Sequence, residues 1–492
     1  MRSFLKTLKI KYKIIFLIIG VISLVSCFSF GTSPLFSMGI VALVMAVWWI
    51  FEVLPLAGTA LLPLVAYPLL GIMSTKKVAP VYMSSILMLF IGGFTVALAM
   101  QKWNLHKRIA LKIVGIFGTK PSGLLMGFMV ATALLSMWIS NTATCVMMVS
   151  IGLAVIKSFE DIYGNCLETK MFSASLMMGI AYSATIGGVA TIVGTPPNLA
   201  FVRIYSMNFP NQSEFYFSSW LMFGLPICIL MLLSAFLVLY FMRIRKHPLR
   251  PLSEEIIQDE LIKLGPIKKE EKWISLIFIL MASLWVFRKK INIGSFSIQG
   301  WSDYLPYPKF VDDGTVAIMM ALLLFMIPSK KEGRILDKKV FDEIPWGTIL
   351  LFGGGFALAK GIQSTGLSTL IGESFLGISD VSPYFVISSL TLGMSFLTEL
   401  TSNMASTEML LPILAAISKS SGIPPLSIMI PATLAASCAF MFPAATAPNA
   451  IVFGSKRVQI SEMIKSGFLI NLISVLIITL FSLFFIPLFF PS

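Results

Sequence analysis

The chain has 492 residues, of which 57% are hydrophobic and only 12% are charged, with a mean hydropathy of +0.89. Soluble domains carry about twice that share of charged residues, so the composition excludes one and indicates a polytopic membrane protein. Basic cytoplasmic loops explain the net charge of +14, and nucleic acid is not an expected partner. The five cysteines form no CxxC pair, which argues against a disulfide framework or a structural metal site.

The chain begins with a basic segment followed by apolar helices. Five Lys and Arg residues within 1–13 predict a cytoplasmic N-terminus. Residues 14–30 lack a small-residue cleavage site and are predicted to form a retained helix, followed by helices at 37–53, 56–72 and 84–100. Basic and apolar residues then alternate at helical spacing over 102–115. This pattern predicts a helix flat on the cytoplasmic interface, with a wet face of Lys102, His106, Lys107 and Arg108.

The apolar stretch 122–156 is too long for one helix, because a hydrocarbon core about 30 Å thick needs about 20 residues. Its centre carries Ser140, Asn141 and Thr142. Unpaired polar groups in lipid cost several kcal/mol, so these residues are paired inside the protein or line a wet cavity. We predict two half-length helices that meet at this motif, forming a re-entrant hairpin from the cytoplasm. The next span, from about 171, is predicted to break at 194–198, where two prolines occur.

The second half is predicted to follow the same plan. A helix at 219–241 leads into a polar cytoplasmic linker at 243–272, and further helices are expected at 273–287, after 313, and at 346–362. The loop 288–313 is expected outside the cell, although its basic start at 288–290 argues against that placement. A second hairpin at 382–418 should enter from outside, because the odd number of spans inverts this half. The last broken span is interrupted at 445–449, and a final helix at 468–489 ends outside.

The two hairpin motifs belong to an internal repeat. A shift of 262 residues, the difference between positions 141 and 403, places Ser140-Asn141-Thr142 on Ser402-Asn403-Met404. The same shift carries Gly92-Gly93-Phe94 onto Gly354-Gly355-Phe356. Paired interruptions in two halves of a membrane protein are the best sequence indication of a transport site.

The four broken stretches contain the chemistry for binding ions. Free carbonyls and helix C-terminal ends bind Na⁺, whereas helix N-termini carry about half a positive charge and bind anions. Hydroxyl and amide side chains complete an oxygen shell without fixed charge. No Lys, Arg or His lies in these stretches, so helix ends and co-bound cations must neutralise an anion there.

Three carboxylates, Glu52, Glu399 and Glu408, are predicted to lie inside the membrane. Each is a functional candidate, because a carboxylate at mid-bilayer costs a few kcal/mol. Two interpretations remain open for each of them: a hydrogen-bonded structural residue, or a residue that couples transport to protons.

At these residues the chain resembles the divalent anion:sodium symporter family, which includes sodium-coupled dicarboxylate and citrate transporters. The resemblance covers nearly the whole chain and includes WWIFEVLPLAGTALLPLVAYPLLGI, both Ser-Asn motifs, IVGTPPN, FDEIPWGTILLFGGGFALAKG and FPAATAPNAIVFGS. It implies an all-α membrane fold of about eleven transmembrane helices and two re-entrant hairpins in an inverted repeat. It further implies a homodimer and an elevator mechanism, in the plasma membrane with the C-terminus extracytoplasmic.

The family plan divides the chain into scaffold and transport parts. Scaffold segments are expected at 1–118 and 273–380, transport segments at 119–242 and 381–492, and the linker at 243–272. By position, one sodium site would use Ser136, Ser140, Asn141 and Gly194, and the other Thr398, Ser402, Asn403 and Ala445. The substrate carboxylates would contact Ser140, Asn141, Thr142, Thr195, Ser402, Asn403 and Thr446, with Met404 also at the site. Two departures from the family pattern, Met404 in place of Thr and Ala447 in place of Pro, bear on which substrate is bound.

The expected function is sodium-coupled uptake of C4-dicarboxylates such as succinate, malate and fumarate, with no organic cofactor. The alternatives on the same fold are a sodium-independent dicarboxylate exchanger and a sodium-coupled citrate or sulfate carrier. A membrane enzyme is disfavoured, because no span carries a His/Asp/Glu cluster or an activated nucleophile pattern. A channel is disfavoured because inverted repeats with broken helices favour alternating access.

Overall fold

The structure is a computed structural model that describes residues 2–212, 214–251, 255–293, 296–329, 333–375, 377 and 381–486. It is almost entirely helical, as predicted. Six helical segments in this part of the chain are long and apolar enough to cross a bilayer: Lys11–Ser29, Thr75–Lys102, Asn141–Tyr163, Leu167–Val189, Phe217–Ile244 and Ile460–Phe484. The helical membrane class is therefore confirmed, whereas the number of eleven spans stays a prediction.

The helices of the first half begin at local sequence signals. Ser33 caps α2 by accepting the Phe36 N–H at 3.3 Å, and proline occupies the first turn of α8 and α11. The single helix predicted over 56–72 is wrong, because the chain divides at Leu61 and Pro63 lies in the first turn of the next helix. The elements are α1 (Arg2–Ser29), α2 (Pro34–Ile50), α3 (Leu56–Ala60), α4 (Leu62–Leu69), α5 (Thr75–Val78), α6 (Ser85–Lys102), α7 (Leu105–Ile116), α8 (Pro121–Ser136), α9 (Asn141–Tyr163), α10 (Leu167–Val189), α11 (Pro196–Asn208) and α12 (Phe217–Leu239).

The amphipathic helix α7 differs in one respect from its prediction. Arg108, expected on the wet face, is buried and pairs through Nε with a Glu271 carboxylate oxygen at 2.7 Å. Lys102 and Lys107 remain partly exposed and pair with Asp337 and Glu260. The sequence pattern alone does not reveal the acidic partner that allows Arg108 to be buried.

The second half contains the linker helix α13 (Glu255–Lys263), a two-stranded β1–β2 hairpin and a long C-terminal helix. The last helix begins at 460 rather than 468, because Gln459 and Glu462 form a capping box that starts it earlier. The elements are α14 (Lys269–Val286), β1 (Ile291–Ile293), β2 (Phe296–Ile298), α15 (Asp313–Met326), β3 (Pro328–Ser329), β4 (Gly333–Arg334), α16 (Val340–Glu343), α17 (Trp346–Ser364), α18 (Leu367–Glu373), α19 (Pro383–Leu400), α20 (Asn403–Ser421), α21 (Pro425–Ala435), α22 (Ala447–Gly454) and α23 (Ile460–Phe484).

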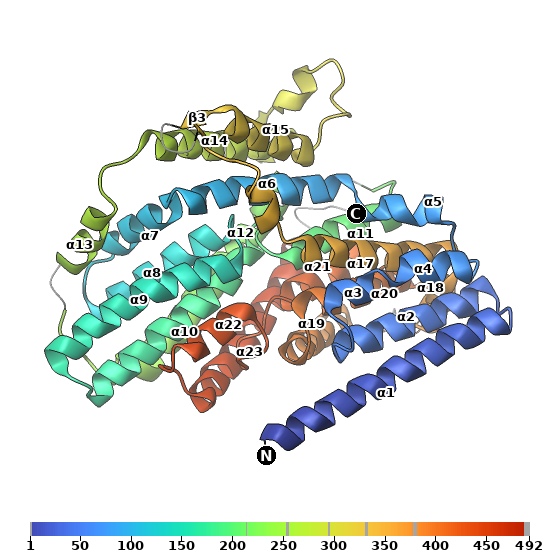
Figure 1. Cartoon of the computed structure of the whole chain (residues 1–492), viewed down its shortest axis with the longest axis horizontal. Helices are drawn as coiled ribbons and strands as arrows, with labels where there is room; N and C mark the ends of the chain where they lie inside the picture. Colours follow the sequence, from blue (N-terminus) through green and yellow to red (C-terminus); the bar gives the residue numbers. More distant parts are fainter. Residues whose placement is uncertain are drawn as a thin grey trace.

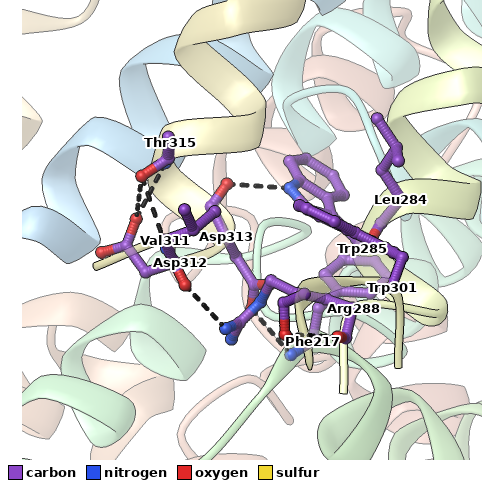
Figure 2. A network of polar contacts seen from close by, with 10 residues as sticks. Phe217, Leu284, Trp285, Arg288, Trp301, Val311, Asp312, Asp313 and Thr315 are labelled. Atoms are coloured by element: carbon purple, nitrogen blue, oxygen red, sulfur yellow. Dashed lines mark hydrogen bonds and ion pairs between the residues drawn. The ribbon is translucent and has the colours of Figure 1, made fainter. Parts of the chain in front are cut away.

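The first of the three basic residues after α14, Arg288, lies in a buried ion pair. Arg288 Nε donates to Asp313 Oδ1 at 2.5 Å, and its Nη1 donates to the Val311 carbonyl at 3.1 Å (Figure 2). The Phe217 N–H donates to the other Asp313 carboxylate oxygen at 3.0 Å. Arg288 is thus neutralised inside the protein. Its charge therefore no longer argues against placing the loop outside the cell.

The helices gather in groups around the centre of the molecule. In Figure 1, α7 to α10 lie on one side, α2 to α5 with α17, α18 and α20 lie on the other, and α14 and α15 lie above α6. Helices α19, α22 and α23 lie in between, where α22 packs against α9 and α10. The first predicted hairpin, α8–α9, therefore lies in one group, whereas the second has α20 in the other group and α19 between the groups.

Candidate functional site

Each predicted hairpin breaks at its Ser-Asn motif. Helix α8 ends at Ser136 and α9 starts at Asn141, while α19 ends at Leu400 and α20 starts at Asn403. The breaks are confirmed, but the half-length expectation is wrong for α9, which runs for 23 residues. Trp138 holds the first break, because its ring stacks on Phe217 at 5.7 Å and meets Phe278 edge-on at 5.0 Å between centroids.

The break in each of the two interrupted helices is bridged by the side chain of one asparagine. Asn198 Nδ2 donates to the carbonyls of Gly188 and Thr191, at 3.1 and 2.8 Å. Asn449 Nδ2 donates to those of Ala439 and Phe442, both at 3.1 Å. These amides replace the helical donors that the carbonyls lose where the helix is interrupted.

A cluster of oxygen atoms lies under the first hairpin break. Ser136 Oγ lies 2.6 Å from both the Asn141 side-chain oxygen and the Ala184 carbonyl, and its single proton is donated to one of them. With the amide turned over, Asn141 Nδ2 would donate to Ser136 Oγ, to the Ala184 carbonyl at 3.1 Å and to the Gly194 carbonyl at 3.2 Å. Ser136, Asn141, Ala184 and Gly194 therefore bring four oxygens together, a set that suits a hard cation such as Na⁺.

The second half repeats this cluster. Thr398 Oγ1 lies 2.6 Å from the Asn403 side-chain oxygen and 2.9 Å from the Ala436 carbonyl, and its single proton is donated to one of them. Thr398 is fully buried, as Ser136 is. The hydroxyl and the carboxamide of the two clusters are thus related by the shift of 262 residues, and each hydroxyl also contacts a main-chain carbonyl.

The two clusters adjoin one cavity of about 1040 Å³. Every predicted substrate residue lines it, as do Gly194 and Ala445, whereas Ser136 and Thr398 lie buried behind its wall. The lining residues predicted from the sequence are Ser140, Asn141, Thr142, Gly194, Thr195, Ser402, Asn403, Met404, Ala445 and Thr446. Residues separated by 306 positions in the chain, from 140 to 446, are therefore brought to one place.

Four helices start at this cavity: α9, α11, α20 and α22, whose first residues all line it. Helix N-termini carry partial positive charge and free N–H groups, so their convergence favours an anion. Among the described lining residues, Lys13 of α1 is the only Lys, Arg or His, and Glu52 and Glu399 are the only acids. The cavity wall therefore has little fixed positive charge, as the sequence predicted.

The three predicted intramembrane carboxylates differ in their surroundings. Glu399 accepts the N–H groups of Phe440, Met441 and Phe442 at 2.6 to 3.1 Å, and Asn471 Nδ2 at 2.8 Å, so it fits the structural interpretation. Glu52 is exposed to the cavity on left-handed backbone with φ of 46°. Glu408 is fully buried and does not line the cavity.

Some lining and ligating groups were not predicted. The carbonyls of Ala184 and Ala436 contribute oxygens through the main chain, which no residue type signals. Trp138, Tyr12 and Lys13 also line the cavity. Trp138 lies just before the first motif but is not a polar residue, and Tyr12 and Lys13 lie in the N-terminal segment, far from both motifs in sequence. Their apolar or basic surroundings resemble those of many other residues in the chain.

Comparison with known proteins identifies the family of this chain. Residues 6–490 match the family model described as the sodium:sulfate symporter transmembrane region. The chain belongs to the divalent anion:sodium symporter family. The resemblance seen in the motifs is thereby confirmed over nearly the whole chain. Since the members of this symporter family are transporters, the membrane-enzyme alternative is excluded.

Two similar proteins of the symporter family carry the name sodium-dependent dicarboxylate transporter SdcS. One, from Staphylococcus saprophyticus, is 40% identical over 455 residues, and one from Staphylococcus aureus is 42% identical over the same length. Each alignment covers 91% of this chain and 85% of the relative. The fold resembles the crystal structure of the Alcanivorax borkumensis YdaH transporter, with a TM-score of 0.56 over 90% of this chain and 97% of that one, at 12% identity. This last likeness concerns the fold alone.

Proposed function

We propose that the chain is a secondary active transporter that takes up C4-dicarboxylates together with sodium. The observation that carries this proposal is one cavity that joins four helix N-termini to two matching oxygen clusters. Helix N-termini suit the carboxylates of a dianion, and neutral oxygens suit Na⁺. The names of the two staphylococcal relatives point to the same pair of solutes.

In this proposal each oxygen cluster binds one sodium ion. Ser136, Ser140, Asn141 and Gly194 bind the first, with the Ala184 carbonyl added. Thr398, Ser402, Asn403 and Ala445 bind the second, with the Ala436 carbonyl added. Because each sodium ion would lie next to a hairpin motif, the ions supply the positive charge that the cavity lining lacks.

The dicarboxylate would bridge the two hairpins. Ser140, Asn141, Thr142 and Thr195 would hold one carboxylate on the first-hairpin side. Ser402, Asn403 and Thr446 would hold the other, with Met404 contributing apolar surface and no hydrogen-bond donor.

The cavity also reaches Tyr12 and Lys13 near the basic end of α1. Since basic segments favour the cytoplasm, this supports an inward-open state of the transporter. We propose that the hairpins are re-entrant from opposite sides, and that 119–242 and 381–492 move as transport parts against scaffold parts at 1–118 and 273–380. The dimer, the elevator motion and the extracytoplasmic C-terminus belong to the same proposal.

The test is uptake of labelled succinate into proteoliposomes that contain the purified full-length protein, with sodium or choline outside. We expect succinate accumulation only with a sodium gradient. Sodium should also raise succinate affinity by the same factor by which succinate raises sodium affinity, because coupling between binding sites is reciprocal. Equal succinate affinity in sodium and choline, with exchange against internal succinate, would support the exchanger instead. Competition by citrate and sulfate separates the remaining alternatives.

A further inference from the structure

Glu408 is a carboxyl group that the proposed transport site does not use. It lies in the second hairpin, on the second turn of α20, and its exposed fraction is 0%. Among the described residues, neither of its carboxyl oxygens has a hydrogen-bond partner. It therefore differs from Glu399, whose carboxylate accepts four hydrogen bonds.

The carboxyl group of Glu408 lies directly against α17. A Cβ atom at Gly355 would overlap its Oε2, Cδ and Cγ atoms, so only glycine admits the side chain there. Gly353 and Gly354 precede Gly355, and they provide no polar side chain to pair with an acid. The close contact joins the second hairpin to a helix of the proposed scaffold.

Several helices pack against α20, the helix that carries Glu408. Helices α2, α11, α17, α18, α19 and α21 pack against α20, and α2 and α21 contain no charged residue. In the described part of the chain, no ion pair joins Glu408 to any Lys or Arg. The titratable groups on these helices and on α20 itself are Arg203, Tyr205, Lys360, Glu373, Tyr384, Glu399 and Lys419.

The repeat shows that this acid is not required by the hairpin fold. The shift of 262 residues that relates the two hairpin motifs places Val146 at the position of Glu408. Val146 is 53% exposed on α9, so the first hairpin has neither an acid nor a buried contact at this position. The carboxyl group belongs to the second hairpin alone and to its contact with α17.

We propose that Glu408 is a proton-binding site, occupied by one proton when α20 packs against α17. An ionised carboxylate without a partner is strongly disfavoured in a buried site, and such groups neutralise instead. A protonated carboxyl group is neutral and fits against the glycine backbone of α17. The ligand is a proton from water, and it binds at a place separate from the sodium and dicarboxylate site. Packing of the second hairpin on the scaffold then takes up one proton.

Infrared spectroscopy of the purified full-length protein tests this proposal directly. At pH 7 the wild type should show the carbonyl stretch of a protonated carboxyl group, and Glu408→Gln should lose the intensity of one such group. Glu373→Gln is the matched control, because Glu373 is an exposed acid on α18. That control should leave the band unchanged. A band of equal intensity in wild type and Glu408→Gln would overturn the proposal, whatever the transport activity proves to be.

A stability measurement keeps the test decisive if Glu408→Gln folds poorly. Glu408→Leu removes the proton site while keeping similar volume. If the acid is neutral and unpaired, the leucine variant should unfold at or above the wild-type temperature. The melting temperature of Glu373→Gln, which keeps Glu408, should fall relative to that of Glu408→Leu as the pH rises from 6 to 9, because unfolding releases the proton that the folded protein holds. If Glu408 is ionised and held by a partner, Glu408→Leu should instead lower the melting temperature by many degrees, which would refute the proposal.

Discussion

Asn198 and Asn449 perform the same structural task in the two halves of the chain. Each donates its side-chain amide to two carbonyls that lie ten and seven residues before it. Both follow a proline in the first turn of a short helix, α11 or α22, that starts at the cavity. The breaks that bring helix ends to the cavity are therefore closed by a matched pair of buried amides.

Replacing either asparagine should destabilise the protein. Asn198→Ala and Asn449→Ala each leave buried carbonyls without a donor, and an unsatisfied buried group costs about 1–3 kcal/mol. We expect a lower melting temperature in detergent for both variants. Asn211→Ala, in the exposed segment after α11, is the matched control and should melt as the wild type does. Wild-type melting of both buried variants would show that the amides do not support the breaks.

The carboxamides of the two hairpin motifs should determine sodium affinity. Asn141→Ala and Asn403→Ala each remove an oxygen from one of the proposed sodium sites. A contact to a charged group contributes about 1.5–3 kcal/mol, so we expect the half-saturating sodium concentration to rise about tenfold or more. Succinate uptake at varied sodium measures this, again with Asn211→Ala beside it. If both variants fold and keep the wild-type sodium dependence, the proposed sodium sites are wrong.

Met404 should make the substrate site asymmetric. It lines the cavity at 5% exposure, in the position where the first hairpin has Thr142. Threonine has a hydroxyl donor and methionine has none. We expect Met404→Thr to tighten succinate binding by about tenfold, the scale of one charge-assisted hydrogen bond, while sodium affinity changes little.

Half-saturation constants for succinate, malate, citrate and sulfate measure the effect of Met404→Thr. A shift in preference between C4 and C6 acids would also fit the asymmetric site. Four unchanged constants together with lower stability would show instead that Met404 only fills space.

The buried pair of Arg288 and Asp313 should be important for stability. Its two side chains are 5% and 8% exposed, and removing one partner of such a pair costs about 3–5 kcal/mol. We expect Asp313→Asn and Arg288→Gln each to lower the melting temperature strongly, and the double variant to lose less than the sum. Lys263, whose side chain is 69% exposed, is the control, since Lys263→Gln removes only a surface ion pair with Glu260 and should leave the melting temperature nearly unchanged. Additive losses in the double variant would exclude coupling between Arg288 and Asp313.

The breaks were predictable because their signals are local. Ser402 directly precedes the start of α20 at Asn403, and Thr195 directly precedes the start of α11 at Pro196. Serine and threonine favour the position before a helix and proline favours its first turn, so the break positions follow from a few neighbouring residues. The repeat then related the two sites without any knowledge of the fold. The motifs and breaks located in this way line one cavity, and the resemblance to the symporter family supplied the individual site residues.

What the sequence missed depends on distant partners. Arg108 looks like a surface residue until Glu271, 163 positions away, is placed beside it. Asp313 similarly neutralises Arg288, and the Ala184 and Ala436 carbonyls supply oxygen independently of residue type. The length of α9 was missed because the apolar stretch ends at Ile156, whereas the helix continues through the mostly polar residues 157–161 and ends before Gly164, where φ becomes positive.

The contacts that connect each hairpin to the neighbouring broken helix differ chemically in the two halves. Thr191 Oγ1 donates to the Met137 carbonyl in the first half, whereas Glu399, at the position equivalent to Met137, accepts backbone N–H groups in the second. A chain assembled from two first halves would therefore have a methionine in place of Glu399, and the N–H groups that Glu399 accepts would lack that carboxylate. The halves therefore keep a common asparagine in the break, while the contact beside the break has a different chemistry in each half.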